Sequence, residues 1–173
     1  MKLNWFNIGL LLFFAGIFSC HNNTYRIATH DKEQEGVSKG KYIPVFAAPD
    51  STGKQVVIEQ IMGKATIIDF WASWCRPCRE SANPAYKKLY KRYHSKGLQI
   101  IGISSDRHQY FWKKALKEDS LPWTQVIDST HLILQQFKVK SIPTMLLIDR
   151  YGKITGRNLW GEKLEHQIDS LLQ

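Results

Sequence analysis

Residues 67–78 read Ile-Ile-Asp-Phe-Trp-Ala-Ser-Trp-Cys-Arg-Pro-Cys, an apolar strand followed by a turn that carries two cysteines with two residues between them. The chain has only three cysteines, and the other one, Cys20, falls in an expected export signal. We therefore expect Cys75 and Cys78 to pair with each other. A bridge that closes so short a loop adds little stability through chain entropy. A redox role accounts for the pair better than a structural role does.

The N-terminus predicts the compartment. Lys2 precedes an apolar run at residues 8–18, which is too short to span a bilayer and has the length of a signal-peptide core. The run ends in Ser19-Cys20, which resembles the lipobox of bacterial lipoproteins, although Phe18 departs from the small residue usual there. A plain signal peptide and an uncleaved anchor are the alternatives. All three place the rest of the chain outside the cytosol, where disulfides persist.

We divide the chain into a lipoprotein signal peptide at residues 1–19, a flexible tether at 20–41 and one domain at 42–173. The tether is polar and has no hydrophobic period. The formal net charge is +9, and its lysines and arginines are spread along the chain, as on a solvated face. An anionic membrane nearby would fit this charge. No basic and aromatic residues interleave as on a nucleic-acid-binding surface, so we expect no nucleic acid partner.

Hydrophobic periodicity and turn signals predict strands that alternate with helices. The expected strands are residues 42–46, 55–58, 65–70, 98–104, 124–127 and 144–149, with another from residue 154 onward. The expected helices are residues 78–94, stopped by Gly97, then 108–119 and 131–137, and a last one from residue 161. This alternation indicates an α/β fold with a central mixed β-sheet flanked by helices on both faces.

The chain from about Tyr42 to its end resembles the thioredoxin superfamily, and within it the membrane-tethered thiol-disulfide oxidoreductases of the TlpA/ResA type. The resemblance is carried by Pro49-Asp50 before Gly53-Lys54, by the block Trp-Ala-Ser-Trp-Cys-Arg-Pro-Cys-Arg, and by Ser141-Ile142-Pro143-Thr144 before a strand. It implies a thioredoxin-like fold with an N-terminal β extension and a central helix–strand insertion between residues 105 and 128.

The residues of the motif suit disulfide exchange. Cys75 is expected at the N-terminal mouth of a helix, where backbone N–H groups and the helix dipole stabilise a thiolate. Pro77 suits the first turn of a helix, and exposed Arg76 adds a modest favourable field. Cys78 lies one turn further in, so we expect it to be better buried. Cys75 is therefore the predicted attacking thiol and Cys78 the resolving one.

Asp69 lies six residues before Cys75, in the place that the buried acid of thioredoxins occupies. A carboxyl buried under the disulfide would have a raised pKa and could exchange a proton with the resolving thiol. The alternative is an aspartate that is hydrogen-bonded at the end of a strand. Relatives usually carry an acid three residues after the second cysteine, where this chain has Ser81. We therefore assign Glu80 no catalytic role.

The resemblance also implies that Pro143 follows a cis peptide bond and lies opposite the cysteines. The backbone N–H and C=O of Ile142 would then pair with an extended substrate segment. Trp74 is expected to pack beside the thiols and to shield the disulfide, whereas Trp71 is expected in the core. The predicted substrate-binding residues are thus Trp74, Ile142 and Pro143.

The expected function is that of an extracytoplasmic thiol-disulfide oxidoreductase, a monomer that needs no cofactor and reduces disulfide-bearing proteins. Pro77 and Asp69 favour reduction over oxidation, and the physiological substrate stays open. A reductase outside the cytosol needs electrons, so a membrane thiol donor is an expected partner. Lipid on Cys20 would hold the protein in the cell envelope, facing the periplasm.

Two other functions are open to a chain with this motif. A thiol peroxidase wants a lone peroxidatic cysteine with Thr or Ser three residues before it, but Ala72 lies there and Cys78 follows closely. A zinc site wants four ligands, and none of the six histidines forms a closely spaced pair. Copper chaperones of similar fold space their cysteines more widely. We therefore expect no metal site.

Overall fold

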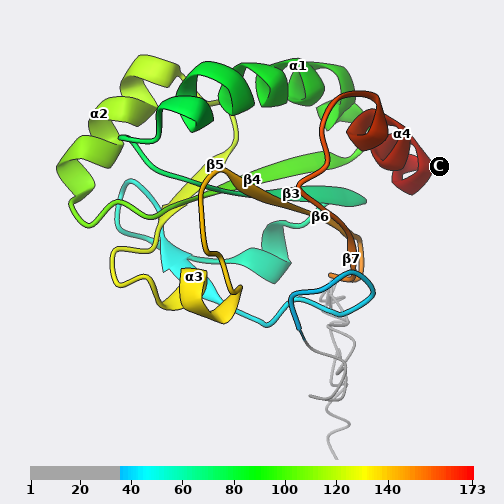
Figure 1. Ribbon diagram of the computed structural model, residues 1–173, viewed down its shortest axis with the longest axis horizontal. Coiled ribbons are helices and arrows are strands. Elements are labelled where there is room, and N and C mark those ends of the chain that lie inside the picture. Colours follow the sequence, from blue (N-terminus) through cyan, green and yellow to red (C-terminus); the bar gives the residue numbers. More distant parts are fainter. Residues whose placement is uncertain (1–35) are drawn as a thin grey trace, which may run out of the picture.

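The computed structural model describes residues 36–173 (Figure 1). The expected signal peptide at 1–19, the lipidation site Cys20 and most of the tether lie outside the described residues. The strands are β1 Ala47–Pro49, β2 Gln55–Val57, β3 Ala65–Trp71, β4 Leu98–Ser104, β5 Thr124–Ile127, β6 Thr144–Asp149 and β7 Ile154–Arg157. The α-helices are α1 Asn83–Tyr93, α2 Gln109–Asp119, α3 Leu132–Gln136 and α4 Gly161–Leu172. None of the helices in residues 36–173 is long and apolar enough to cross a membrane.

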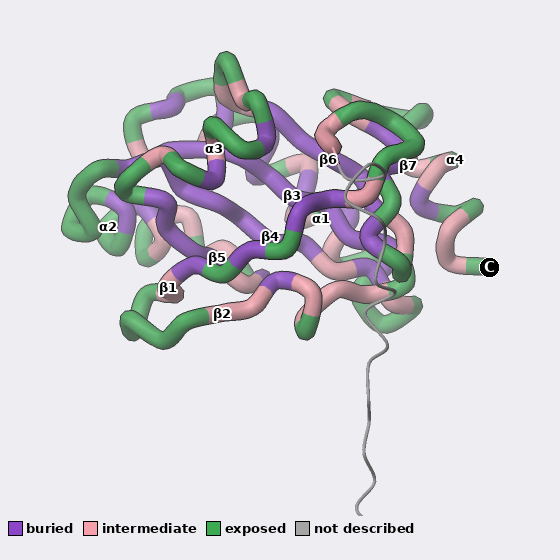
Figure 2. Tube along the Cα trace, turned by 90° about the horizontal axis from the view of Figure 1, so that it is seen from below, coloured by how far each residue is buried: buried purple, intermediate pink, exposed green. Residues whose placement is uncertain are grey.

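Five strands form a mixed sheet in the order β5-β4-β3-β6-β7. β3 pairs in parallel with β4 and antiparallel with β6, so it lies in the middle of the sheet. Every residue of β3 is buried, as expected for a central strand covered on both faces (Figure 2). The predicted mixed sheet is confirmed, and its central strand ends directly before the cysteine motif.

Helices cover both faces of this sheet, with α1, α2 and α4 on one side and α3 on the other (Figure 1). Side chains alternate along β3, so Ile67 packs with Tyr86 of α1 on the first face, while Phe70 packs with Phe137 on the second. The β1–β2 hairpin contributes to the second face through Ala48. The predicted flanking of the sheet by helices on both faces is therefore confirmed.

The N-terminal β extension is present, but its first strand is displaced from the predicted position. The sequence predicts a strand at residues 42–46, whereas ladder pairing with β2 begins at Ala47. Of residues 42–46, Tyr42 forms an isolated bridge with Lys153. Pro44 interrupts this segment because it has no backbone N–H to donate to a ladder.

The helix that follows the cysteines is not the continuous α-helix that the sequence predicts. Residues Cys78–Ala82 form a π-helix, in which the backbone N–H of Asn83 donates to the carbonyl of Cys78. Pro84 explains the difference, because it has no N–H to donate to the carbonyl four residues before it. The backbone hydrogen bonds there span five residues instead of four. The α-helix proper then ends before Gly97, which has φ 111° and stops the helical segment as predicted.

The predicted insertion brings α2 and β5 to the edge of the sheet. β5 pairs in parallel with β4, so it extends the sheet by one strand. Helix α2 begins at Gln109, one residue after the predicted start, and buries Trp112 and Ala115. Both side chains pack in one cluster with Cys75 and Cys78, so the insertion forms part of the wall around the disulfide.

Candidate active site

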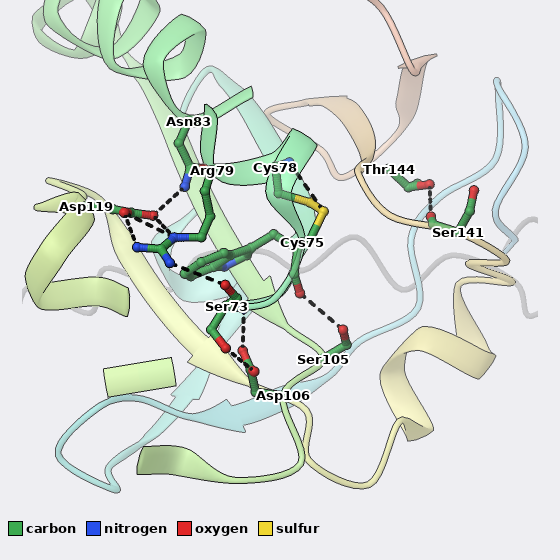
Figure 3. Close-up of a disulfide and its surroundings, with 11 residues drawn as sticks. Ser73, Cys75, Cys78, Arg79, Asn83, Ser105, Asp106, Asp119, Ser141 and Thr144 are labelled. Atoms are coloured by element: carbon green, nitrogen blue, oxygen red, sulfur yellow. Dashed lines mark hydrogen bonds and ion pairs between the residues drawn. A yellow bond between two sulfur atoms is a disulfide. The ribbon is translucent and has the colours of Figure 1, made fainter. Parts of the chain in front are cut away.

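The two cysteines of the motif form a disulfide just beyond the end of β3 (Figure 3). The Cα atoms of Cys75 and Cys78 are 5.3 Å apart, so the predicted pairing is confirmed. The backbone N–H of Cys75 donates a hydrogen bond of 3.0 Å to the carbonyl of Ala72, which turns the chain out of the strand. Helical backbone starts at Arg76, so Cys75 caps the N-terminus of the helix.

The cap position favours negative charge on the sulfur of Cys75. The backbone N–H of Cys78 donates a hydrogen bond to Cys75 Sγ over 3.3 Å. Pro77 has φ −61° and ψ −32°, which is helical backbone that needs no N–H at this first turn. A thiolate released at Cys75 would therefore meet backbone N–H groups and the positive end of the helix dipole.

The two cysteines differ less in exposure than predicted. Cys75 is 4% exposed and Cys78 is fully buried. The order is the predicted one, but Cys75 is itself a buried residue. Ile142, from the loop before β6, packs against the cluster that contains both cysteines.

Arg76 is exposed as expected, but its guanidinium forms an ion pair with Glu80. Its side chain is 83% exposed, and Nε donates to Glu80 Oε2 over 2.8 Å. This pair lies one helical turn apart on the solvent face. Glu80 therefore offsets the positive field that Arg76 would otherwise supply to the sulfur of Cys75.

Trp74 lies at the surface, and its role in shielding the disulfide stays a prediction. Trp74 is 69% exposed, because the turn after β3 directs it to the surface. Its indole is therefore a surface group next to Cys75. Trp71 is buried as predicted, and its indole N–H donates to Gln125 Oε1 over 3.0 Å.

Asp106, which no motif of the sequence marks, holds the turn that leads into Cys75. Its carboxylate accepts hydrogen bonds from the backbone N–H of Ser73 at 2.8 Å and from the Ser73 hydroxyl at 2.6 Å (Figure 3). The hydroxyl of Ser104 donates to the same carboxylate at 2.6 Å. The only indication of this contact in the sequence is that Asp106 follows β4 as the cysteine motif follows β3. Parallel neighbouring strands end at the same edge of a sheet, so the segments that follow them lie close together.

A second contact that the sequence did not predict joins the active-site helix to the insertion. Arg79 donates from Nε and Nη2 to the carboxylate of Asp119 at 2.9 and 2.6 Å (Figure 3). Asn83 Nδ2 donates to the same carboxylate over 3.2 Å. These bonds raise the pKa of Arg79 and fix the C-terminal end of α2 against the helix that carries Cys78.

Asp69 is buried in β3, on the sheet face that α1 covers. Burial raises the pKa of its carboxyl from 3.8 to about 8, and no group in residues 36–173 donates a hydrogen bond to Oδ1. The nearby Tyr86 also has a raised pKa, through its own burial and the charge of Asp69. Asp69 therefore lies under the helical segment that runs from Cys78 to Tyr86 and beyond.

The peptide bond between Ile142 and Pro143 is cis, as predicted. Both residues are half-buried, and the loop is closed by a hydrogen bond of 2.7 Å from the Thr144 hydroxyl to the carbonyl of Ser141. Figure 3 shows Ser141 and Thr144 on the side of the disulfide opposite Asp119. The loop and the cysteines thus form two walls of one site.

Within residues 36–173, no group of three or more His, Cys, Asp or Glu side chains is arranged to hold a metal ion. His131, just after the insertion, uses Nε2 in a hydrogen bond with the carbonyl of Ser105 at 2.8 Å. The chemistry available at the site is therefore that of the two sulfurs, the carboxyl of Asp69 and the surrounding backbone.

Comparison with known proteins agrees with this geometry. Residues 39–157 match the model of a family described as the AhpC/TSA family. The thiol-disulfide oxidoreductase ResA of Bacillus cereus is 32% identical over 141 residues, which cover 82% of this chain and 80% of that protein. The thioredoxin domain of a thiol-disulfide oxidoreductase from Bacteroides vulgatus superposes with a TM-score of 0.72 at 30% identity, covering 80% of this chain and all of that one. A thiol-disulfide oxidoreductase from Bacteroides fragilis superposes with a TM-score of 0.69 at 35% identity, covering 76% of this chain and 99% of that one.

Proposed function

Since the chain belongs to the AhpC/TSA family and is a thioredoxin-like protein-disulfide oxidoreductase, we propose that it works outside the cytosol as a reductase of protein disulfides. The observation that carries the proposal is the Cys75–Cys78 pair at a helix N-terminus, and the buried carboxyl of Asp69 in the strand that leads to this pair supports it. The cis Ile142–Pro143 loop provides the wall along which an extended substrate segment would pair.

In the reduced protein, Cys75 is the attacking thiolate. Its sulfur forms a bond with one sulfur of the substrate disulfide, the substrate S–S bond breaks, and the leaving thiolate takes up a proton. Cys78 then loses its proton and attacks Cys75 Sγ, which forms the Cys75–Cys78 disulfide and releases the second substrate thiol. Two electrons and two protons pass to the substrate in total.

Asp69 exchanges the proton of Cys78. In the oxidised protein at neutral pH, a pKa of about 8 leaves the carboxyl mainly protonated. When a donor thiolate attacks Cys75 and the disulfide opens, Cys78 leaves as a thiolate and takes this proton. In the opposite direction the ionised carboxylate accepts the proton of Cys78 before it attacks.

The proposed location outside the cytosol and the proposed direction of the reaction, reduction of the substrate, both rest on the sequence. The apolar run that ends in Ser19-Cys20 supports a lipid anchor in the cell envelope, with residues 20–41 as the tether. A reductase that works outside the cytosol needs a source of electrons, so we propose a membrane dithiol as the electron donor. Pro77 and the thioredoxin-like position of Asp69 support reduction as the direction.

An insulin-reduction assay with dithiothreitol as the electron source tests the activity. We expect turbidity from the released insulin chains to appear earlier with the wild-type protein than with Cys75→Ser, which controls for reduction by the reagent alone. Peroxide consumption without insulin reduction would indicate a thiol peroxidase instead. A stoichiometric metal in the purified protein without either activity would indicate a metal-binding role.

A further inference from the structure

A positively charged groove of about 510 Å³ opens beside the cis-proline loop. Its basic side chains are Lys39, Lys138, Lys140 and Arg157, and none of the residues that line it is acidic. We call it the basic groove. A second, adjoining pocket of about 380 Å³ shares Lys39 and adds Lys41 and Lys153, so the positive surface continues past the groove.

The charges of the basic groove have no counter-ion within the described part of the chain. Its four cations form no ion pair with residues 36–173, whereas Arg76, Arg79 and Arg92 each pair with a carboxylate. Arg157 is half-buried, and its Nη1 lies 3.4 Å from the carbonyl of Val37. A concave surface of one sign of charge focuses the field and attracts the opposite charge.

The backbone of the groove is unusual at two positions. Lys138 has φ 50° and Asn158 has φ 51°, a left-handed conformation that glycine adopts at lower cost than lysine does. At Lys138 this conformation ends the helical segment of α3, where the backbone N–H of Val139 donates to the carbonyl of Leu134 over 2.9 Å, and it fixes Lys138 at the side of the groove.

The groove and the disulfide share one loop. Ser141 and Thr144 line the groove and also flank the cis peptide bond. Ile142, between them, packs against the cluster that contains both cysteines. A polypeptide that presents a cysteine to Cys75 along this loop would therefore reach the groove.

We propose that the basic groove binds acidic side chains of an extended polypeptide segment that adjoins the substrate cysteine, so that disulfides flanked by carboxylates react faster than others. This inference rests on the proposed reductase function, to which it adds a substrate class. Charge complementarity selects an acidic partner. The position of the groove beside the cis-proline loop selects carboxylates of a polypeptide that pairs along this loop over those of a lipid surface.

Two synthetic peptides with the same internal disulfide test the proposal, one with three glutamates beside a cysteine and the other with three glutamines. The reduced full-length protein is mixed with each peptide, and the ratio of the second-order rate constants is measured. We expect the glutamate peptide to react roughly tenfold faster at low salt, because of electrostatic attraction. The ratio should approach one at high salt, because screening weakens exposed charges.

Two charge-reversal variants locate the effect. In Lys138→Glu/Lys140→Glu the ratio should fall to one or below. Lys91→Glu/Lys163→Glu makes the same charge change at exposed positions on α1 and α4, and it should keep the ratio of the wild type. Each ratio is referred to the variant's own rate with the glutamine peptide, and thermal melting checks that both variants fold.

Equal rates for the two peptides with the wild-type protein would overturn the proposal. Equal loss of the ratio in both variants would overturn it as well, because net charge and not the groove would then be responsible. Equal peptide rates together with binding to phosphatidylglycerol vesicles that Lys138→Glu/Lys140→Glu abolishes would assign the groove to a membrane surface. Failure to reduce either peptide would contradict the reductase function itself, and with it the role of the groove.

Discussion

The carboxylate of Asp106 accepts hydrogen bonds from both the backbone N–H and the hydroxyl of Ser73, over 2.8 and 2.6 Å. This contact ties the turn before Cys75 to the first residues of the insertion. The position of the attacking sulfur therefore depends on a segment that is remote in the sequence.

Removal of the Asp106 carboxylate should affect both stability and reaction. In Asp106→Ala the half-buried N–H of Ser73 loses its acceptor, so we expect the free energy of unfolding to fall by about 2–4 kcal/mol. Denaturant unfolding of the oxidised protein measures this change. Asp128→Ala is a matched control, because that buried carboxylate accepts bonds from Leu134 N–H and the Thr130 hydroxyl near α3. If the two variants reduce insulin equally fast, Asp106 does not position the active-site turn.

The two cysteines should behave differently when each is replaced. Cys78→Ser removes the resolving thiol, so we expect stable mixed disulfides between Cys75 and partner proteins. Cys75→Ser removes the attacking thiol and should trap none. Non-reducing gel electrophoresis followed by mass spectrometry of the adducts measures both. Equal trapping by the two variants would contradict the assignment of the attacking and the resolving thiol. The test is demanding because Cys75 and Cys78 differ little in exposure.

The raised pKa of Asp69 predicts a pH-dependent stability. In the folded oxidised protein the pKa is about 8, above the ordinary 3.8, so the folded state binds the proton more tightly. The stability that this proton contributes is complete below pH ~4 and is lost as the pH rises toward 8, by up to ~1.4 kcal/mol per pH unit. Asp69→Asn carries no such titration and should be more stable at pH 7, by on the order of 2–4 kcal/mol.

The same substitution should slow the opening of the disulfide. Asp69→Asn has no proton to give to Cys78, so single-turnover reduction of the Cys75–Cys78 bond by a phosphine should be slower than in the wild type. The difference should shrink above pH 8, where Asp69 itself is ionised. Glu59→Gln is the control, because Glu59 is a half-buried carboxyl with a raised pKa on the opposite face of the sheet. Lower stability of Asp69→Asn with an unchanged rate would make Asp69 a structural residue.

Lipid on Cys20 is predicted from the sequence alone. We expect the mature N-terminus to be an acylated Cys20, found in the membrane fraction, and Cys20→Ala to release the protein into the soluble fraction. Mass spectrometry of the N-terminal peptide measures the modification. A mature chain that starts at another residue would refute the anchor.

Much of the fold follows from the sequence because buried strands between turn signals are easy to recognise. The bounds of β4, β5 and β6 agree with the predicted ranges, since each is an apolar run that ends at a polar turn. Two prolines account for the main differences. Pro44 keeps residues 42–46 out of the ladder, and Pro84 widens the helix after Cys78 into a π turn.

The candidate site could be predicted where one short motif carries it. Cys75, Cys78 and the burial of Asp69 follow from residues 67–78, and the cis bond at Pro143 follows from the resemblance. Asp106 and Asp119 could not be found in this way. Their partners are 33 and 40 residues away in the chain, so only tertiary packing brings them to the cysteines.

The reduction potential of the Cys75–Cys78 pair decides whether the protein acts as a reductase. Equilibration of the purified protein with glutathione or dithiothreitol buffers, followed by quantification of free thiols, measures it. We predict a value near that of thioredoxin, about −270 mV, because Pro77 and Asp69 favour a reductase. A value near about −120 mV, as in a strong oxidant, would contradict it.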